Sequence, residues 1–426
     1  MNNSFNKILD NLVEGEKYKT LPPRGPIDLP FPSVSDEELQ ASEEDIYGQN
    51  ERDPLNKENP NIKIAEQSGI YEVKLPDSKL LEGLSVIGIA GNNIRILTTS
   101  FHLILSKAAV VNFKYTKGFD KPYFYTKFRN SSALMVLDNN IFEDNYSLFT
   151  YNDLSERDIS VPILDHIYKN PDKPFRFKYN YEKSKKSPSS QSLGLAVKFQ
   201  HTLELSTIED TNFDQLGTTI CLKEGALFSN STQQTDIKNG LKKLFQWADK
   251  PKIFIAVSSK VFESRVFINT LTSLPHLIED YFPDQNITTK IINSFGTDTL
   301  LLKKILKPGF RTPLIEYIEK TREGVISDPE LEGLKPVTCY YHKRTKPYNF
   351  IRLEIPKFMW EKNKALVEFA ISVVIWQYEL GGSKPLVLKA ALERCELDHE
   401  KNIIEQQMKA AFEKKKLDLI EFLSVS

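Results

Sequence analysis

The chain has 426 residues, of which 40% are hydrophobic and 11% aromatic, so it can bury one large hydrophobic core or two smaller ones. Lys and Arg total 56 against 57 Asp and Glu, which gives a net charge of −1 and excludes a protein-wide basic field. Any contact with nucleic acid therefore has to use a local surface. No stretch approaches the roughly 18 apolar residues of a membrane span, and the N-terminus lacks a signal-peptide pattern. We expect a cytoplasmic protein without a membrane segment.

The first 61 residues predict an extension rather than part of a core. Residues 1–20 have apolar positions at helical spacing, and the proline-rich stretch TLPPRGPIDLPFP then ends that helix. Residues 35–60 are polar and acidic, which is typical of a flexible, solvated arm and equally compatible with a partner-binding segment. We therefore assign 1–61 to a helix with a flexible extension, and 62–426 to the folded domain.

Strands dominate the first part of that domain. Residues 84–93 and 94–115 are rich in β-branched and aromatic side chains and predict two or three consecutive strands, and residues 132–140 predict another short strand. Strands that follow one another without an intervening helix pair antiparallel.

Helices and strands alternate in the rest of the chain. The expected elements, in chain order, are a helix in 193–210, a strand in 218–228, a helix in 239–250, a strand in 252–260, a hairpin in 336–356, a buried helix in 364–381, and two helices in 385–416 with a break near 397–399. The strand–helix–strand alternation predicts parallel pairing. Together with the antiparallel strands before it, this pattern predicts an α/β, ribonuclease H-like mixed sheet flanked by helices.

Several kinds of site are excluded by their missing motifs. The chain has no Gly-rich phosphate loop, no GxSxG elbow and no HExxH pair. Its three cysteines, Cys221, Cys339 and Cys395, form no CxxC pair, so we expect no zinc site and a reducing compartment.

A set of segments in a fixed order carries the most specific signal. The segments are VIGIAGNN, SFHLILSKAAVVNF, HTLELSTIED, TICLKEGALFS, IAVSSK, TDTLLLKKILKPG, YYHKR with NFIRLEIPKF, and KPLVLKAALERCEL. In this order, over roughly residues 80–410, they resemble the NurA family of DNA-end-processing nucleases. The resemblance implies a NurA-type fold, a homodimer, Mn²⁺ or Mg²⁺ as cofactor, and work on DNA beside a HerA-like hexameric ATPase in DNA repair or antiviral defence.

The positions that match the family's site depart from its pattern. The family's Asp-Gly-Ser motif corresponds to Ala90-Gly91-Asn92, so the metal-binding Asp is replaced by Ala90. The second Asp-Gly motif corresponds to Glu224, and the helix carboxylate to Glu204, although a small alignment shift would exchange it with Glu209. The family's Tyr-Pro pair and the His that follows it correspond to Lys384-Pro385 and Leu392.

The resemblance therefore assigns a reduced set of site residues. Glu204 and Glu224 are the candidate catalytic and metal-binding groups. Asp138, at the end of an apolar run, is a candidate replacement carboxylate for the metal; the alternative is that it simply belongs to a turn. Hard divalent cations prefer clustered carboxylates, and two carboxylates support at most one weakly held Mg²⁺ or Mn²⁺ rather than two metals. The candidate DNA contacts are Lys260, Lys384 and Arg352.

Three hypotheses follow from these residues. The first is an active, metal-dependent NurA-like nuclease. The second is a catalytically inactive scaffold or DNA-binding subunit, which the simultaneous presence of Ala90, Lys384 and Leu392 favours. The third discards the resemblance and makes the chain an α+β interaction protein whose acidic arm recruits a partner.

Overall fold

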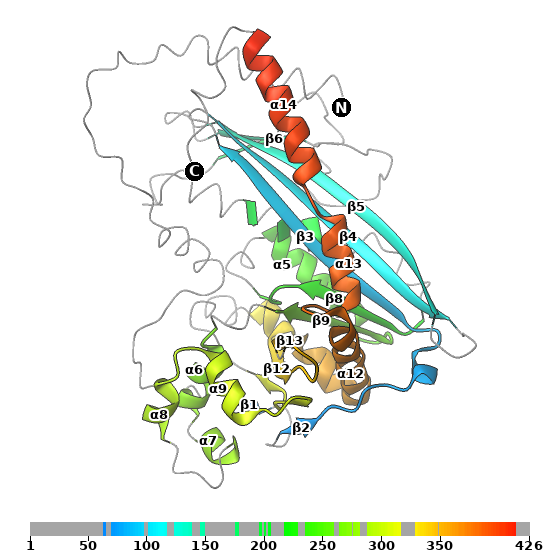
Figure 1. Cartoon of the computed structure of the whole chain (residues 1–426), viewed down its shortest axis with the longest axis vertical. Coiled ribbons are helices and arrows are strands. Elements are labelled where there is room, and N and C mark those ends of the chain that lie inside the picture. The colour runs from blue at the N-terminus through cyan, green and yellow to red at the C-terminus, as the bar shows by residue number, and fades with distance from the viewer. Residues whose placement is uncertain are drawn as a thin grey trace.

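Figure 1 shows the chain as a computed structural model. The structure describes residues 63–64, 70–97, 101–116, 123–138, 145–149, 175–178, 196–197, 200–201, 203–205, 217–228, 235–259, 264–274, 276–281, 288–316, 329–347 and 349–414. The predicted extension 1–61, Glu209 and Lys260 lie outside these residues. For the strands between 123 and 178 the backbone alone is described.

Within the described residues, a thirteen-stranded mixed sheet has the order β1-β11-β12-β13-β9-β8-β3-β4-β5-β6-β7, with β10 paired to β12 and β2 paired to β10. The strands are β1 (Lys63–Ile64), β2 (Tyr71–Glu72), β3 (Ser85–Leu97), β4 (Phe101–Thr116), β5 (Tyr123–Asp138), β6 (Asn145–Phe149), β7 (Phe175–Lys178), β8 (Thr219–Glu224), β9 (Lys252–Ser258), β10 (Phe310–Arg311), β11 (Ile315–Glu316), β12 (Pro336–His342) and β13 (Phe350–Pro356).

The middle of the sheet has the predicted mixture of directions. β3, β4 and β5 pair antiparallel, whereas β8 pairs parallel with β3, and β9 parallel with β8. The parallel strands are buried along their length, as expected for strands that are covered on both faces. The prediction of a mixed α/β sheet is thus confirmed.

Helices cover this sheet and extend from it. They are α5 (Thr235–Lys242), α6 (Val266–Ser273), α7 (His276–Tyr281), α8 (Thr289–Asn293), α9 (Asp298–Ile305), α11 (Lys357–Lys362), α12 (Lys364–Gly381), α13 (Leu386–Arg394) and α14 (Asp398–Lys414), with a short 3₁₀ helix, η4 (Lys243–Trp247), after α5. The hairpin β12–β13, the helix α12 and the break between α13 and α14 all agree with the sequence predictions. The predicted strand 132–140 overlaps the end of β5, which begins earlier, at Tyr123.

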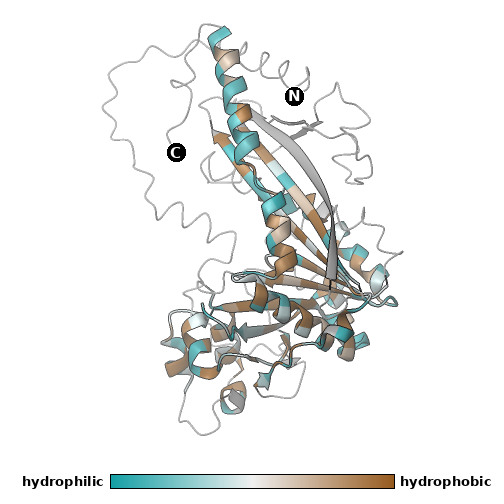
Figure 2. Cartoon of the chain, turned by 45° about the vertical axis from the view of Figure 1, so that its right-hand side comes forward, coloured by the Kyte–Doolittle hydropathy of each residue, from teal (hydrophilic) through white to brown (hydrophobic). Residues whose placement is uncertain are grey.

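The long strands β3, β4 and β5 form an arm that rises from the body of the molecule, with α13 and α14 beside it (Figure 1). α13 packs on β3 and β4. Further out, Lys107 Nζ of β4 lies 2.8 Å from Glu400 Oε1 of α14. In Figure 2 much of α14 is hydrophilic, whereas much of α13 is hydrophobic.

Two clusters of buried side chains stabilise the body. The main core joins the central strands to α12 and α13. A second core joins α6 to α9 and reaches the sheet through Tyr340 of β12 and Phe350 of β13. Among the helices that the structure describes, none is both long and apolar enough to cross a bilayer.

Candidate functional site

The strand register brings Ala90 and Glu224 to one level of the sheet. Ile89 of β3 is paired with Lys223 of β8, so the next positions along these two parallel strands are Ala90 and Glu224. Glu224 is the last residue of β8 and is paired with Val257 of β9. The carboxyl ends of adjacent parallel strands are a common place for ligand sites in α/β sheets, so the polar groups around this end of β8 form the candidate site.

The first carboxylate at this end belongs to Glu204, in a segment that is helical where it is described (196–205). Its side chain is 1% exposed, and its Oε2 lies 3.1 Å from Nζ of Lys223, which is 4% exposed. Gln200 Nε2 donates to Glu204 Oε1 at 2.8 Å. The charge of Glu204 is therefore balanced inside the protein by an ammonium group.

The second carboxylate, Glu224, has an ammonium partner of its own. Lys384 Nζ donates to Glu224 Oε1, and the two side chains are 26% and 21% exposed. Lys384 lies in the connection between α12 and α13, and this connection is held by Lys343, whose Nζ donates to Gly382 O at 2.6 Å. Gly382 has a φ of 85°, a left-handed conformation that suits glycine and ends α12. The pair Lys384–Glu224 is thus more open to water than Lys223–Glu204.

Ala90 is fully buried and offers no donor atom from its side chain. Its backbone oxygen accepts a hydrogen bond from Cys395 Sγ at 3.1 Å. Burial, and secondly the nearby Glu204 carboxylate, raise the pKa of Cys395 to about 12. Cys395 is therefore a neutral thiol at neutral pH, and the position next to Ala90 carries no negative charge.

Backbone and helix approach closely at Gly91. A Cβ atom at Gly91 would lie 2.6 Å from Glu204 Oε1 and 2.7 Å from Gln200 Cγ. Asn93, two residues further along β3, donates through Nδ2 to Gln200 Oε1 at 2.6 Å. Glu204 is thus fixed by a polar chain that runs from β3 through Gln200 to the carboxylate and on to Lys223.

The remaining predicted site residues lie elsewhere. Phe101 pairs with Asp138 and Ala109 with Ala90, so Asp138 is eight residues along β4 from the level of Ala90. At about 3.3 Å per residue this is about 26 Å along the strand, so the structure does not bring Asp138 together with Glu204 and Glu224. Leu392 packs against the main core.

Arg352, which the sequence predicts as a DNA contact, is a buried residue of β13. Its Nε lies 3.0 Å from Glu354 Oε1, and its side chain is 9% exposed. Glu354 Oε2 in turn accepts a hydrogen bond from Leu227 N at 2.6 Å. The two residues therefore connect β13 to the segment that follows β8.

The side chains at this end of the sheet do not fit a divalent metal. Ala90 supplies no ligand, and each of the two carboxylates is already engaged by a lysine. Within the described part of the chain, no group of three or more His, Cys, Asp or Glu side chains could hold a metal ion. Hard divalent cations are held by several oxygen ligands, and an ammonium group among them opposes the cation.

Sequence patterns did not reveal three residues of this site. Lys223, Gln200 and Cys395 match none of the family's site positions, and each contacts a residue of another element. Lys223 did carry one usable signal, since a lysine within the apolar run TICLKE predicts a buried partner of opposite charge.

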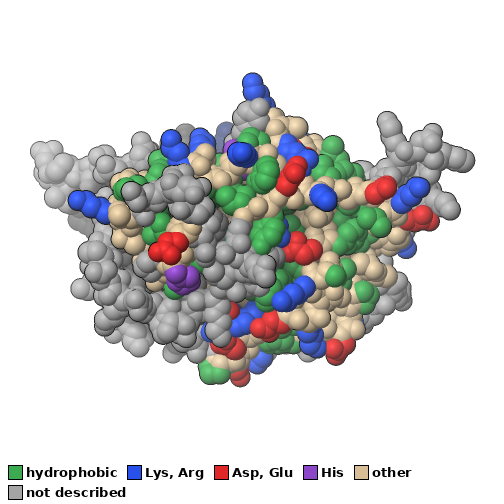
Figure 3. All heavy atoms as spheres, turned by 90° about the horizontal axis from the view of Figure 1, so that it is seen from below, with side chains coloured by type: hydrophobic (Ala, Val, Ile, Leu, Met, Phe, Trp, Pro, Cys, Tyr) green, Lys and Arg blue, Asp and Glu red, His purple; other side chains and the backbone are tan. Residues whose placement is uncertain are grey.

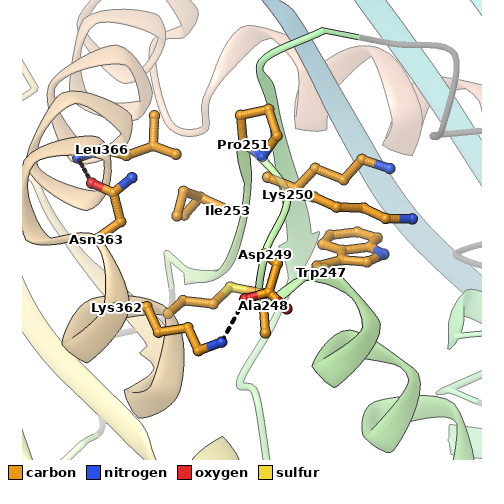
Figure 4. A pocket seen from close by; sticks show the side chains of 11 residues that line it. Trp247, Ala248, Asp249, Lys250, Pro251, Ile253, Lys362, Asn363 and Leu366 are labelled. Atoms are coloured by element: carbon orange, nitrogen blue, oxygen red, sulfur yellow. Dashed lines mark hydrogen bonds and ion pairs between the residues drawn. The ribbon is translucent and has the colours of Figure 1, made fainter.

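A separate pocket of about 580 Å³ lies at the opposite end of β9 (Figure 4). Pro251, Ile253 and Leu366 line it, and Lys362 Nζ lies 2.8 Å from Asp249 Oδ1 at one side. It contains none of the predicted site residues. This separation leaves the end of β8 as the candidate functional site.

Comparison with known proteins gives a distant resemblance. No sequence model of a protein family matches the chain, and no curated protein sequence matches it. Among solved structures, the NurA nuclease from Sulfolobus solfataricus is similar with 11% identity and a TM-score of 0.35, over 90% of this chain and 95% of that one.

Two further solved structures show the same level of similarity. A NurA bound to dAMP and manganese is similar with 8% identity and a TM-score of 0.29, over 76% of this chain and 87% of that one. The Argonaute from Marinitoga piezophila, in complex with guide RNA and target DNA, has 10% identity and a TM-score of 0.25, over 73% of this chain and 29% of that one. Because these identities and TM-scores are low, the similarity by itself establishes neither a family nor an activity.

Proposed function

We propose that this chain is a non-catalytic relative of the NurA nucleases, which binds DNA beside a HerA-like hexameric ATPase and does not hydrolyse it. The observation that carries the proposal is the pairing of both remaining carboxylates with lysines, Glu204 with Lys223 and Glu224 with Lys384. The proposed setting is DNA repair or antiviral defence.

Electrostatics explains why this pairing opposes metal-assisted hydrolysis. A metal ion in such a site activates water and neutralises the charge of the phosphate, and it needs clustered carboxylates to hold it. Lys223 and Lys384 place two positive charges on the two carboxylates that remain, and Ala90 removes a third ligand. A cation entering this site would have to displace the buried Lys223 from Glu204.

The DNA context of the proposal rests on the ordered sequence segments that resemble the NurA family. The strand order β5-β4-β3-β8-β9, with three antiparallel strands followed by two strands parallel to β3, supports a ribonuclease H-like core of that type. We include in the proposal a homodimer, which light scattering of the purified chain tests against the 48.9 kDa of one protomer.

The decisive experiment compares cleavage and binding of the same DNA. Labelled single- and double-stranded DNA is incubated with the wild-type chain and Mn²⁺, beside the variant Glu204→Gln/Glu224→Gln and with or without a HerA-like ATPase. We expect fluorescence anisotropy to report binding by the wild type, and no cleavage above that of the double variant. Binding without cleavage fits a protein whose site charges are already neutralised.

Two results would contradict the proposal. Mn²⁺-dependent cleavage that Glu224→Gln alone abolishes would show a working metal site and favour the active nuclease. Absence of DNA binding by the wild type, both alone and with the ATPase, would refute the DNA-binding role and favour an interaction protein.

A further inference from the structure

Four exposed lysines gather where the helical lobe meets the β12–β13 hairpin. Lys303 and Lys304 lie in the last turn of α9, Lys307 follows that helix, and Lys346 lies in the hairpin turn. All four are exposed. We call these four residues the basic surface.

Backbone contacts bring the two segments together. Gly309 N donates to His342 O at 2.8 Å, and His342 Nδ1 is 2.8 Å from Leu306 O. A Cβ atom at Gly309, which has a φ of 91°, would lie 2.8 Å from Arg344 Nε, so the chain after α9 lies directly against the hairpin. Lys307 and Lys346 therefore belong to one region of the surface.

The scaffold under the basic surface is closely packed. Leu301, Leu302 and Ile305 of α9 are buried in the second core, which leaves Lys303 and Lys304 on the outer side of the helix. Asp298, at the start of α9, is fully buried and accepts hydrogen bonds from the backbone of α6. A rigid scaffold lowers the entropy cost of presenting several charges to one ligand.

None of the four lysines has an ion-pair partner within the part of the chain that the structure describes, in contrast to other exposed lysines such as Lys362, Lys401 and Lys409. Two acidic side chains beside the hairpin are engaged with Arg344 and its neighbour Thr345. Glu379 accepts hydrogen bonds from the Arg344 and Thr345 backbone. Glu72 Oε1 lies 3.8 Å from Arg344.

A structural role accounts for only part of this cluster. Lysines in the last turn of a helix interact favourably with its carbonyl end, which explains Lys303 and Lys304. Lys307 and Lys346 lie beyond the helix, so this explanation does not reach them. The net charge of the chain is −1, and the face in Figure 3 intersperses basic and acidic side chains. The four lysines, in contrast, have no ion pair with any residue that the structure describes.

We propose that the basic surface formed by Lys303, Lys304, Lys307 and Lys346 binds the sugar-phosphate backbone of DNA. The inference rests on the proposed function and adds the place of contact. Phosphate contacts by lysines release counterions, make affinity fall with salt and carry no sequence preference. Binding here would be independent of any metal at the end of β8.

The test measures the salt dependence of DNA binding by the full-length chain. Binding of labelled duplex of random sequence is followed by anisotropy at several salt concentrations, for the wild type and for Lys303→Gln/Lys304→Gln/Lys307→Gln. Each lost phosphate contact lowers the slope of log K against log salt by about 1. We expect the slope of the triple variant to fall by about 2–3 and the affinity to fall at least about tenfold at low salt.

The matched control is Lys362→Gln/Lys401→Gln/Lys409→Gln, which removes the same charge from exposed lysines that have carboxylate partners. We expect this control to keep the wild-type slope. Circular dichroism confirms that both triple variants are folded.

Equal slopes for the two triple variants would overturn the basic surface while leaving the DNA-binding function intact. No DNA binding by the wild type would overturn the proposed function and this contact surface together.

Discussion

Lys223 lies in β8 among buried residues, and its side chain is 4% exposed. A lysine in such a place is tolerated when an opposite charge and further acceptors are fixed beside it. Glu204 supplies the charge, and the backbone oxygen of Glu224 accepts a hydrogen bond from Lys223 Nζ at 2.8 Å. A divalent cation bound by Glu204 would have to compete with this lysine.

Removing one member of this pair tests its role. Lys223→Met leaves the Glu204 carboxylate buried beside an apolar side chain, and breaking a buried ion pair in this way costs about 3–5 kcal/mol. We expect chemical denaturation to show a loss of unfolding free energy in that range.

The matched control is Lys223→Met/Glu204→Gln, which removes both charges and should recover most of the lost stability. Equal loss in the single and double variants would show that packing of Lys223, and not its charge, matters. Rescue of Lys223→Met by Mn²⁺ would instead show that a metal can take the place of the ammonium.

His342, the last residue of β12, makes the stability of the folded protein depend on pH. Burial, and to a lesser degree Lys303, lower the pKa of His342, while its hydrogen bond to Leu306 O opposes this change. A histidine with a lowered pKa in the folded state contributes stability that is complete above its unfolded pKa of about 6.5 and is lost as pH falls below that value.

We therefore expect the unfolding free energy of the wild type to decrease below pH 6.5, by at most about 1.4 kcal/mol per pH unit from this residue. His342→Asn keeps a donor for Leu306 O and removes the titration. Urea denaturation between about pH 5 and 7.5 should give a flatter profile for this variant. The same slope in both proteins would assign the pH dependence to other groups.

At the scale of secondary-structure elements, two glycines let helices approach β3. A Cβ atom at Gly88 would lie 2.6 Å from Val387 O, in the backbone of α13. At Gly91 the nearest atoms belong to the side chains of Glu204 and Gln200. A substitution at the two positions therefore has different consequences, because a helix backbone cannot move aside as a side chain can.

These contacts predict different costs for the same substitution. Gly88→Ala should force α13 away from β3 and destabilise by about 1–3 kcal/mol or more, the cost of overpacking a core. Gly91→Ala should cost less, because Glu204 and Gln200 can rotate. Thermal unfolding followed by circular dichroism measures both. A larger loss for Gly91→Ala would show that the Glu204–Lys223 pair, and not the α13 contact, dominates this strand.

At the scale of the whole molecule, metal binding can be tested through its effect on thermal stability. A ligand at 100 times its dissociation constant stabilises the folded state by about 2.7 kcal/mol. We expect the melting temperature of the wild type to be the same in millimolar Mn²⁺ as in a salt of the same ionic strength that contains no divalent cation. A rise that Glu204→Gln/Glu224→Gln lacks would show a metal site and contradict the proposed function.

The main elements of the fold were predictable from the sequence because their signals are local. Hydrophobic periodicity located β3, β4, the β12–β13 hairpin and α12, and a break near 397–399 separated α13 from α14. That Ala90 offers no side-chain ligand was likewise visible in the sequence.

The pairings at the candidate site were not predictable in this way. Lys384 and Glu224 are 160 residues apart in the chain, and no local pattern records that they form an ion pair. Asp138 shows that a local pattern can also mislead. It follows an apolar run, as a site residue would, but the register of β4 and β5 places it at the far end of the arm.

The sequence by itself thus determined which residues could carry charge and which elements would form, since helix and strand patterns depend on neighbours in the chain. Only the tertiary structure decided that Lys223 and Lys384 neutralise Glu204 and Glu224, that Arg352 is buried, and that α9 and the hairpin turn share one basic surface. Ion pairs and surfaces depend on distances of a few ångströms between distant segments, and those distances are set by sheet register and core packing.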